Sequence, residues 1–417
     1  MWEPNFLLLH YAGIIFLALL ALPILYPGGN MALIDAFFMG FSSATDAGLP
    51  SVDCSGLSLH QQLYIYLVPL VCNMGFVHVL VTAFHLRRLR GRLNRLVDNL
   101  GFTLTPDSMG HFRDASLPLL LLGTLGLAGQ TLRPVFLRFS LWVCSRIFRG
   151  RDTRESASYL LENPQACLSI FPGVATRVQL MIIAALTVGE TVFITAYDRD
   201  GVEVAGLSLG QRLSAAFFQA AAARHAGMTP YNLANVSAAV QLSLLVMMFI
   251  ATCPIVTAEY DNSAAILASR NSPTYLLRLI REQLSLDVWW FFLGVFCLTV
   301  SEARSVQDDP VSFTPFHSLF HLRYEFWTYA RREKKAFQIF PLMFEVVTAY
   351  NNVGISLGHP DVDAALCARF SVVGKLILCV IMVRGRHRRM IHRFRLLPER
   401  YLLRLEEEES CAVGGFC

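Results

Sequence analysis

The sequence predicts an all-α protein that crosses a membrane several times, and two observations carry this prediction. Hydrophobic residues make up 54% of the 417 residues and charged residues only 16%, with a mean hydropathy of +0.47. These values lie well beyond those of a soluble globular domain. In addition, a short motif around a glycine recurs four times along the chain. Together they predict repeated helical units inside a bilayer.

Runs of about 20 apolar residues are long enough to cross a bilayer as helices. Seven runs meet this criterion, an odd number: roughly 6–26, 61–84, 115–145, 174–197, 236–258, 284–302 and 366–384. The first run lacks a basic leader and ends at ALPILYPGG instead of a small-residue cleavage site. We therefore expect it to stay as a helix and not to be removed as a signal peptide.

The repeated motif consists of an apolar run, a few polar residues, a glycine, an apolar residue and then Pro, Thr or Ser. Its four copies centre on Gly48, Gly101, Gly227 and Gly354. In three copies a phenylalanine lies ten residues before the glycine: Phe38, Phe217 and Phe344. Because glycine permits backbone turns that other residues resist, four such turns could direct carbonyl oxygens toward one axis. A cation filter is built in this way.

Shorter apolar segments, about 33–47, 212–226 and 337–353, each end at a motif glycine and are too short to cross. Non-helical backbone survives in a bilayer only where protein or a water-filled cavity covers it. These segments therefore predict re-entrant pore helices. The alternative, ordinary amphipathic helices in loops, is disfavoured because the motif copies align.

Basic clusters indicate the orientation of the chain. They occupy 85–95, 145–154, 276–282 and 384–395, and all should lie on the cytoplasmic side, which places the glycine turns outside. The net charge of +4 is concentrated in these loops, so we expect no nucleic-acid partner.

Four long stretches also resemble a known family. They contain IDAFFMGFSSATDAGLPSVD (34–53), NLGFTLTPDSM (99–109), SAAFFQAAAARHAGMTPYN (214–232) and FPLMFEVVTAYNNVGISLGHP (340–360), the last continuing to RGRHR. They look like the Trk/Ktr/HKT potassium transporters, and specifically the fungal Trk type. The resemblance implies a monomer of four span–pore–span repeats around a pseudo-fourfold pore in the plasma membrane. Its partners would be the lipid bilayer and monovalent cations, K⁺ and sometimes Na⁺; a homo-oligomer is allowed, and neither a cofactor nor an enzymatic activity is implied.

The resemblance also divides the chain and assigns its filter. The first repeat spans 1–90, a partial second repeat 91–150, the third 151–258, and the fourth 259–395, with a tail at 396–417. The implied filter comprises Thr45, Asp46, Ala47 and Gly48; Asn99, Leu100 and Gly101; His225, Ala226 and Gly227; and Asn352, Val353 and Gly354. Lys375 matches a basic residue of the last helix, just below the filter, and suggests a role in gating.

The residue two positions before each glycine departs from the family pattern. Asp46, Asn99, His225 and Asn352 occupy these positions, where fungal relatives tend to have Gln, Asp, Thr and Thr. Asp46 would add negative charge to a pore, and His225 positive charge below its usual pKa of about 6.5. These side chains would otherwise brace the filter from behind, which is the reading that we favour.

The second repeat departs further. From the cluster 85–95 the chain reaches Gly101 directly, without the first span and pore helix of that repeat. Either 115–145 bends into a re-entrant hairpin at Gly123, Gly126, Gly129 or Pro134, or the sequence is an incomplete version of a longer product, which we favour. The fourth repeat carries an aromatic and basic insertion at about 311–336.

The remaining chemistry is sparse. The ten cysteines show no metal-ligand spacing. Glu345, in the fourth pore helix, is positioned to support the filter by a hydrogen bond, since an intramembrane carboxylate is a functional candidate. The sequence therefore favours K⁺ uptake driven by membrane potential. The alternative is a truncated or non-conducting regulatory relative.

Overall fold

The structure is a computed structural model that describes residues 6–72, 108–147, 173–198, 201–250, 288–303, 338–359 and 364–386, together with 158 and 161. In these ranges the regular elements are helices, and no β-strand occurs. The all-α prediction is therefore confirmed for the described part. The Asn99–Gly101 motif, the insertion at about 311–336 and the tail lie outside it.

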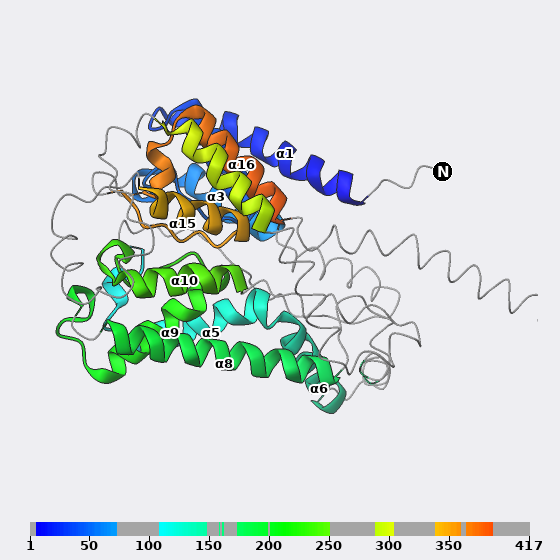
Figure 1. Cartoon of the computed structure of the whole chain (residues 1–417). Coiled ribbons are helices and arrows are strands. Elements are labelled where there is room, and N and C mark those ends of the chain that lie inside the picture. The colour runs from blue at the N-terminus through cyan, green and yellow to red at the C-terminus, as the bar shows by residue number, and fades with distance from the viewer. Residues whose placement is uncertain are drawn as a thin grey trace, which may run out of the picture.

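The helices form two groups (Figure 1). The first group joins the beginning of the chain to its end: α1 (Phe6–Leu25), α2 (Leu33–Ala44), α3 (Leu59–Cys72), α15 (Ile339–Asn351), α16 (Val372–Arg386) and the helix Val288–Ser301. The second contains α5 (Ser116–Gly126), α6 (Arg133–Ile147), α8 (Gly173–Tyr197), α9 (Leu209–His225) and α10 (Ala238–Ile250). Because α10 packs on both α9 and α15, it connects the two groups.

Hydrogen bonds at opposite ends of the first group define how its long helices run. The Gln61 side chain donates to the carbonyl oxygen of Leu25 at 2.5 Å, so the start of α3 meets the end of α1. At the other end, Arg386 donates to the carbonyl oxygen of Cys72 at 2.9 Å, where α3 and α16 both end. Thus α3 and α16 run in the same direction, opposite to α1 (Figure 1).

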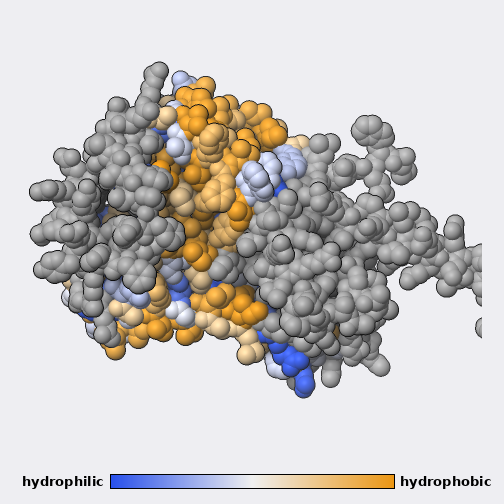
Figure 2. All heavy atoms as spheres, in the orientation of Figure 1, coloured by the Kyte–Doolittle hydropathy of each residue, from blue (hydrophilic) through white to orange (hydrophobic). Residues whose placement is uncertain are grey.

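Two of the described helices are long and apolar enough to cross a membrane, at Tyr11–Gly28 and Gln179–Tyr197. They match the expected spans 6–26 and 174–197. The apolar helices Ala238–Phe249 and Val288–Ser301 are shorter, and the described parts of the expected spans 61–84 and 236–258 end at Cys72 and Ile250. Figure 2 shows a mostly apolar surface across the coloured middle of the visible face.

The expected span 115–145 is not one regular helix. A π-helical turn at Leu127–Thr131 separates α5 from α6. A π-turn alters the backbone hydrogen-bond register, and here Gln179 of α8 donates to the carbonyl oxygen of Thr131 at 3.2 Å. Because α5 packs on α9 and α6 on α8, the segment continues along the second group and does not fold back as a hairpin.

The expected span 366–384 also needs correction, since α16 starts only at Val372. Residues Leu366–Arg369 form a 3₁₀ turn before it. Ser371 then occupies the N-terminal cap: its hydroxyl accepts from the amide of Gly374 at 3.1 Å and donates to Glu302 at 2.6 Å. A hydroxyl at this position satisfies an amide that the helix leaves unpaired.

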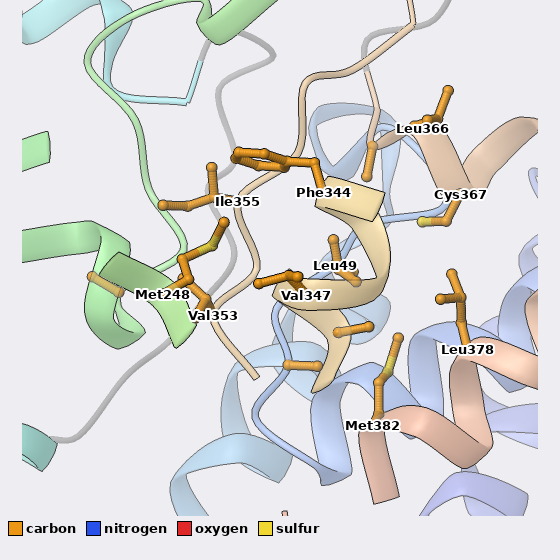
Figure 3. Packing of buried hydrophobic residues seen from close by; sticks show 14 of the residues in the cluster. Leu49, Met248, Phe344, Val347, Val353, Ile355, Leu366, Cys367, Leu378 and Met382 are labelled. Atoms are coloured by element: carbon orange, nitrogen blue, oxygen red, sulfur yellow. The ribbon is translucent and has the colours of Figure 1, made fainter. Parts of the chain in front are cut away.

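The core surrounds the pore-helix candidates α2 and α15. Phe38 and Phe344, the phenylalanines ten residues before their glycines, are fully buried, whereas Phe217 is partly buried. Figure 3 shows Leu49 beside Val347, and Met248 of α10 facing the loop that carries Val353 and Ile355. The apolar core therefore reaches the loops that follow these helices.

Candidate functional site

Three of the four motif copies lie in the described residues, and each is a helix that ends in a glycine turn. The helices α2, α9 and α15 occupy 33–44, 209–225 and 339–351, close to the predicted 33–47, 212–226 and 337–353. Positive φ angles occur at the glycine of each turn: 69° at Gly48, 68° at Gly227 and 89° at Gly354. We call the segments 45–50, 226–230 and 352–357 the first, third and fourth loops.

The first and fourth loops share one backbone conformation. Asp46 and Asn352, two residues before their glycines, have φ of 54° and 52°, a left-handed conformation that is uncommon for residues other than glycine. These residues occupy equivalent positions of the motif, so the first and fourth loops share a backbone shape. The third loop differs, because His225 is still the last residue of α9.

Matching hydrogen bonds hold these two loops against their helices. The amide of Ala47 donates to the carbonyl oxygen of Ser42 at 2.9 Å. The equivalent amide of Val353 donates to the carbonyl oxygen of Thr348 at 3.0 Å. The Ser42 hydroxyl also accepts from the amide of Leu49 at 2.8 Å, and the Thr348 hydroxyl from that of Gly354 at 3.1 Å. Each loop is therefore anchored to the last turns of its own helix.

The first and fourth loops converge. A Cβ added to Gly354 would lie 2.7 Å from the carbonyl oxygen of Ala47 and 2.9 Å from that of Gly48. The amide of Ala365 also donates to the carbonyl oxygen of Pro50 at 3.0 Å. The backbone near the end of the sequence thus lies against carbonyl oxygens of the first loop.

The third loop contacts the segment that follows the second motif. The amide of Met109 donates to the carbonyl oxygen of Thr229 at 2.9 Å, and the amide of Thr229 donates to the Ser108 hydroxyl at 3.0 Å. This contact joins the third loop to Ser108 and Met109, while the second motif itself lies outside the described residues. Convergence is thus seen for Gly48 and Gly354, and that of Gly227 with them stays a prediction.

The Asp46 side chain faces a helix end and is buried. Its Oδ2 lies 2.6 Å from Nη2 of Arg386, and both side chains are less than 5% exposed. Arg386 also donates to the carbonyl oxygen of Cys72, so it connects the first loop, α16 and α3. Asp46 therefore ties the first loop to the ends of α16 and α3. Its predicted place behind a filter stays a prediction.

Lys375 lies elsewhere than the family resemblance implied. It belongs to the first turn of α16, and its Nζ lies 2.5 Å from Oδ1 of Asp35 in the first turn of α2. Arg386 occupies the opposite end of α16. Lys375 is thus at the end of α16 that lies against the start of α2.

Glu345 fixes the chain that follows the fourth loop. Its Oε2 accepts from the Ser356 hydroxyl at 2.8 Å, and its Oε1 accepts from the amide of Cys367 at 3.0 Å. The Ser356 hydroxyl in turn accepts from the amides of Gly358 and Leu366. The fully buried carboxylate is therefore hydrogen-bonded to the loop region, as its position in the sequence predicted.

Sequence reasoning missed several charged residues. It gave no role to Asp35, to Arg386, or to the buried pair Glu190 and Arg224 in α8 and α9. A charged residue inside an apolar segment is costly and is a functional candidate by default, and this rule would have found the last two. Asp35 gave no such signal, because a carboxylate in the first turn of a helix is common.

Beyond the third loop, buried ionisable groups lie at the end of α8. Burial raises the pKa of Asp198, which directly follows α8, and its hydrogen bond with the backbone of Ser237 opposes this. Burial also raises the pKa of Tyr231. Both groups therefore prefer their uncharged forms more than they would in water.

Comparison with known proteins places this geometry in a family. Residues 95–322 and 330–398 match the family TrkH, described as cation transport protein. The chain is 30% identical over 335 residues to potassium transporter TRK1 of Candida albicans, covering 75% of this chain and 30% of that protein. It is also 30% identical over 350 residues to potassium transport protein 2 of Schizosaccharomyces pombe, covering 77% and 37%. The chain thus spans about a third of the length of these relatives.

A solved structure supports the same fold. The potassium transporter TrkH from Vibrio parahaemolyticus superposes with a TM-score of 0.53 and 15% sequence identity, covering 95% of this chain and 86% of that one. The likeness extends over nearly the whole chain and agrees with a helical membrane protein. From the extent of the family match, the chain belongs to the TrkH family of cation transport proteins.

Proposed function

We propose that this chain is a potassium transporter that mediates K⁺ uptake across the plasma membrane. One observation carries the proposal: the first and fourth loops meet with Gly354 against the carbonyl oxygens of Ala47 and Gly48. Carbonyl oxygens in such an arrangement replace part of the hydration shell of a monovalent cation. The relatives named as potassium transporters support K⁺ as the transported ion, with Na⁺ as a second candidate.

The proposed architecture is the fourfold one. The repeats 1–90, 91–150, 151–258 and 259–395 would surround one pore in a multi-pass membrane protein, the second contributing only its filter and following helix. The filter would consist of residues 45–48, 99–101, 225–227 and 352–354. The shared conformation of the first and fourth loops supports this repeat assignment.

The proposed driving force is the membrane potential. Moving one elementary charge through 100 mV changes its free energy by about 2.3 kcal/mol. A negative cell interior therefore draws cations inward through a pore that faces outside. The proposed role of Lys375 in gating acts through Asp35, since their ion pair fixes the start of α16 against the start of α2.

Growth and uptake in yeast test the proposal. A yeast strain that lacks potassium uptake would express this chain and be grown on micromolar potassium. Rubidium uptake and surface expression would be measured in the same cells. We expect uptake for the wild-type chain and its loss in the Gly227→Asp and Gly354→Asp variants. Gly56→Asp is the matched control, because Gly56 is exposed and a Cβ there meets no atom within 4 Å.

The result also decides between the two functional readings. Glycine-dependent uptake supports a working pore despite the short second repeat. Absence of uptake with normal surface expression would overturn the proposal and favour a non-conducting relative of the family.

A further inference from the structure

A buried arginine lies next to the third loop. Arg224, in the last turn of α9, is 2% exposed. It is the largest of the fully buried side chains in the described residues. It is three residues before Gly227. Consecutive Cα atoms are 3.8 Å apart, so the two Cα atoms are within about 11 Å of each other. A positive charge therefore lies beside the backbone proposed to pass cations.

The opposite charge comes from the neighbouring helix. Glu190 of α8 is 5% exposed and interacts electrostatically with Arg224. Ser243 of α10 donates its hydroxyl to Oε2 of Glu190 at 2.7 Å. Buried side chains of α8, α9 and α10 thus interact near the end of α9, the helix that leads into the third loop.

Hydrogen bonding does not explain why an arginine is buried at this position. Nε and Nη2 of Arg224, and Oε1 of Glu190, are buried without a hydrogen-bond partner in the described structure. Burying unpaired polar atoms is costly, and an apolar core at this place would avoid that cost. An electrostatic role is therefore a better account of the pair than a contribution to stability.

The third loop also lacks the anchor of the other two. The hydroxyls of Ser42 and Thr348 bind the first and fourth loops six residues before each glycine. The equivalent residue of the third motif is Ala221, which has no hydroxyl. The third loop thus lacks the hydroxyl anchor of the other two, and its own helix α9 carries a buried arginine three residues before the glycine.

From these observations we propose that Glu190 is a positioning residue that balances the charge of Arg224 and so sets the affinity of the third loop for cations. The inference rests on the proposed function. With both charges present, their contributions to the electrostatic potential at the third loop nearly cancel. Removing Glu190 leaves a positive charge that repels cations, and removing Arg224 leaves a negative charge that attracts them.

Two single variants and their double variant test this proposal. In rubidium uptake, Glu190→Gln should raise KM roughly tenfold, the effect of a unit charge about 10 Å away at an effective dielectric of about 20. Arg224→Gln should lower KM by a similar factor. The double variant Glu190→Gln with Arg224→Gln should return KM to within about threefold of wild type, because the charges are again balanced.

Matched variants separate charge from packing. Arg224→Lys keeps the charge and should keep a KM near wild type. Glu203→Gln removes a carboxylate that lies 3.7 Å from Arg113 and should leave KM unchanged, because Arg113 is 44% exposed and solvent screens this pair. If both single variants shift KM in the same direction, or only reduce surface expression, the pair is merely structural and the proposal is overturned.

A binding measurement keeps this inference separate from the proposed function. If the wild-type chain shows no uptake, the purified protein is heated at increasing K⁺ concentrations, since a bound ion raises the unfolding temperature. Stabilisation that Glu190→Gln weakens and Arg224→Gln strengthens supports the inference even though transport has failed. An identical K⁺ dependence in all variants, including no dependence at all, overturns it.

Discussion

At the scale of single residues, the first and fourth loops depend on backbone conformations that few residues adopt. Asp46 and Asn352 adopt left-handed conformations near φ of 50°, and the glycines that follow them are also left-handed. Apart from glycine, Asp and Asn are among the residues that adopt this conformation most readily, because their short polar side chains can hydrogen-bond locally. The hydroxyls of Ser42 and Thr348 also bind the two loops to their helices and stabilise the loop shape.

Gly354→Ala should abolish uptake. The new Cβ would add backbone strain at φ of 89° and would lie 2.7 Å from the carbonyl oxygen of Ala47, displacing a proposed ion ligand. We expect rubidium uptake per surface molecule to fall at least about tenfold, corresponding to 1.4 kcal/mol or more in the transport barrier. Gly358→Ala is the control: the backbone there is also left-handed, with φ of 72°, but the new Cβ would lie 3.8 Å from its nearest neighbour, the carbonyl oxygen of Ala364. Equal loss in both variants would assign the effect to strain alone.

Asp198→Asn should stabilise the protein at neutral pH. The folded-state pKa of Asp198 is raised above 3.8, mainly by burial and further by Glu203, so the protonated form favours folding. That stability is present below the unfolded-state pKa and is lost as pH rises through the folded-state value. Asparagine resembles the protonated acid and, like it, carries no charge whose burial is unfavourable.

Thermal unfolding in detergent measures this effect. At pH 7 the variant should be more stable by about 1 kcal/mol, the scale of one unsatisfied buried polar group. The difference should shrink toward zero below about pH 3, where the wild-type carboxyl is protonated in both the folded and the unfolded state. Asp114→Asn, at an exposed position, should have no effect. A variant less stable than wild type at pH 7 would refute the assignment.

At the scale of elements, local patterns suffice for the helices and glycine turns but not for their irregularities. The apolar runs and the spacing from Phe38 to Gly48 predict α2 and its turn, because both signals lie within one short segment. The π-turn at Leu127–Thr131 was not predicted, since its carbonyl is satisfied by Gln179 from another helix. The late start of α16 likewise depends on Glu302, far from it in sequence.

The ion pair between α2 and α16 belongs to this scale. Lys375 and Asp35 are 340 residues apart in sequence, and their side chains are 5% and 15% exposed. Asp35→Asn or Lys375→Met alone leaves one charge nearly buried without its partner. Breaking such a pair costs about 3 kcal/mol, so both variants should unfold at lower temperature and reach the surface poorly.

The exchanged pair Asp35→Lys with Lys375→Asp provides the comparison. It keeps both charges and should recover part of the stability and surface expression of wild type. Rubidium uptake per surface molecule then isolates the proposed gating role. Recovery no better than the single variants would mean that the two side chains do not act as a pair.

At the scale of the whole molecule, the first loop is tied to the far end of the sequence. Arg386 contacts Asp46 of that loop and the carbonyl oxygen at the end of α3. The first loop, the end of α3 and the end of α16 therefore meet at one guanidinium group. The sequence showed Asp46 as an unusual filter residue and RGRHR as a family motif, but only the tertiary structure brings them together.

Arg386→Gln should therefore affect the loop and not only the end of α16. The variant leaves the Asp46 carboxylate buried without its partner, which costs about 3–5 kcal/mol for a pair of this kind. We expect reduced thermal stability and rubidium uptake. Arg384→Gln is the matched control: Arg384 lies 5.2 Å from the centre of the Trp290 ring, a contact worth only about 0.5–1 kcal/mol.

A double-mutant cycle measures the coupling between the loop and the helix end. Asp46→Asn with Arg386→Gln removes both charges, so no ion remains buried alone, and the pair should lose less stability than the sum of the single variants. The expected coupling is about 0.5–3 kcal/mol in thermal or denaturant unfolding. If the stability losses of the single variants add up, the two side chains act independently. The shape of the first loop would then depend on Ser42 and α2 alone. Non-additive losses that extend to rubidium uptake would make this contact the link through which the last helix maintains the first loop.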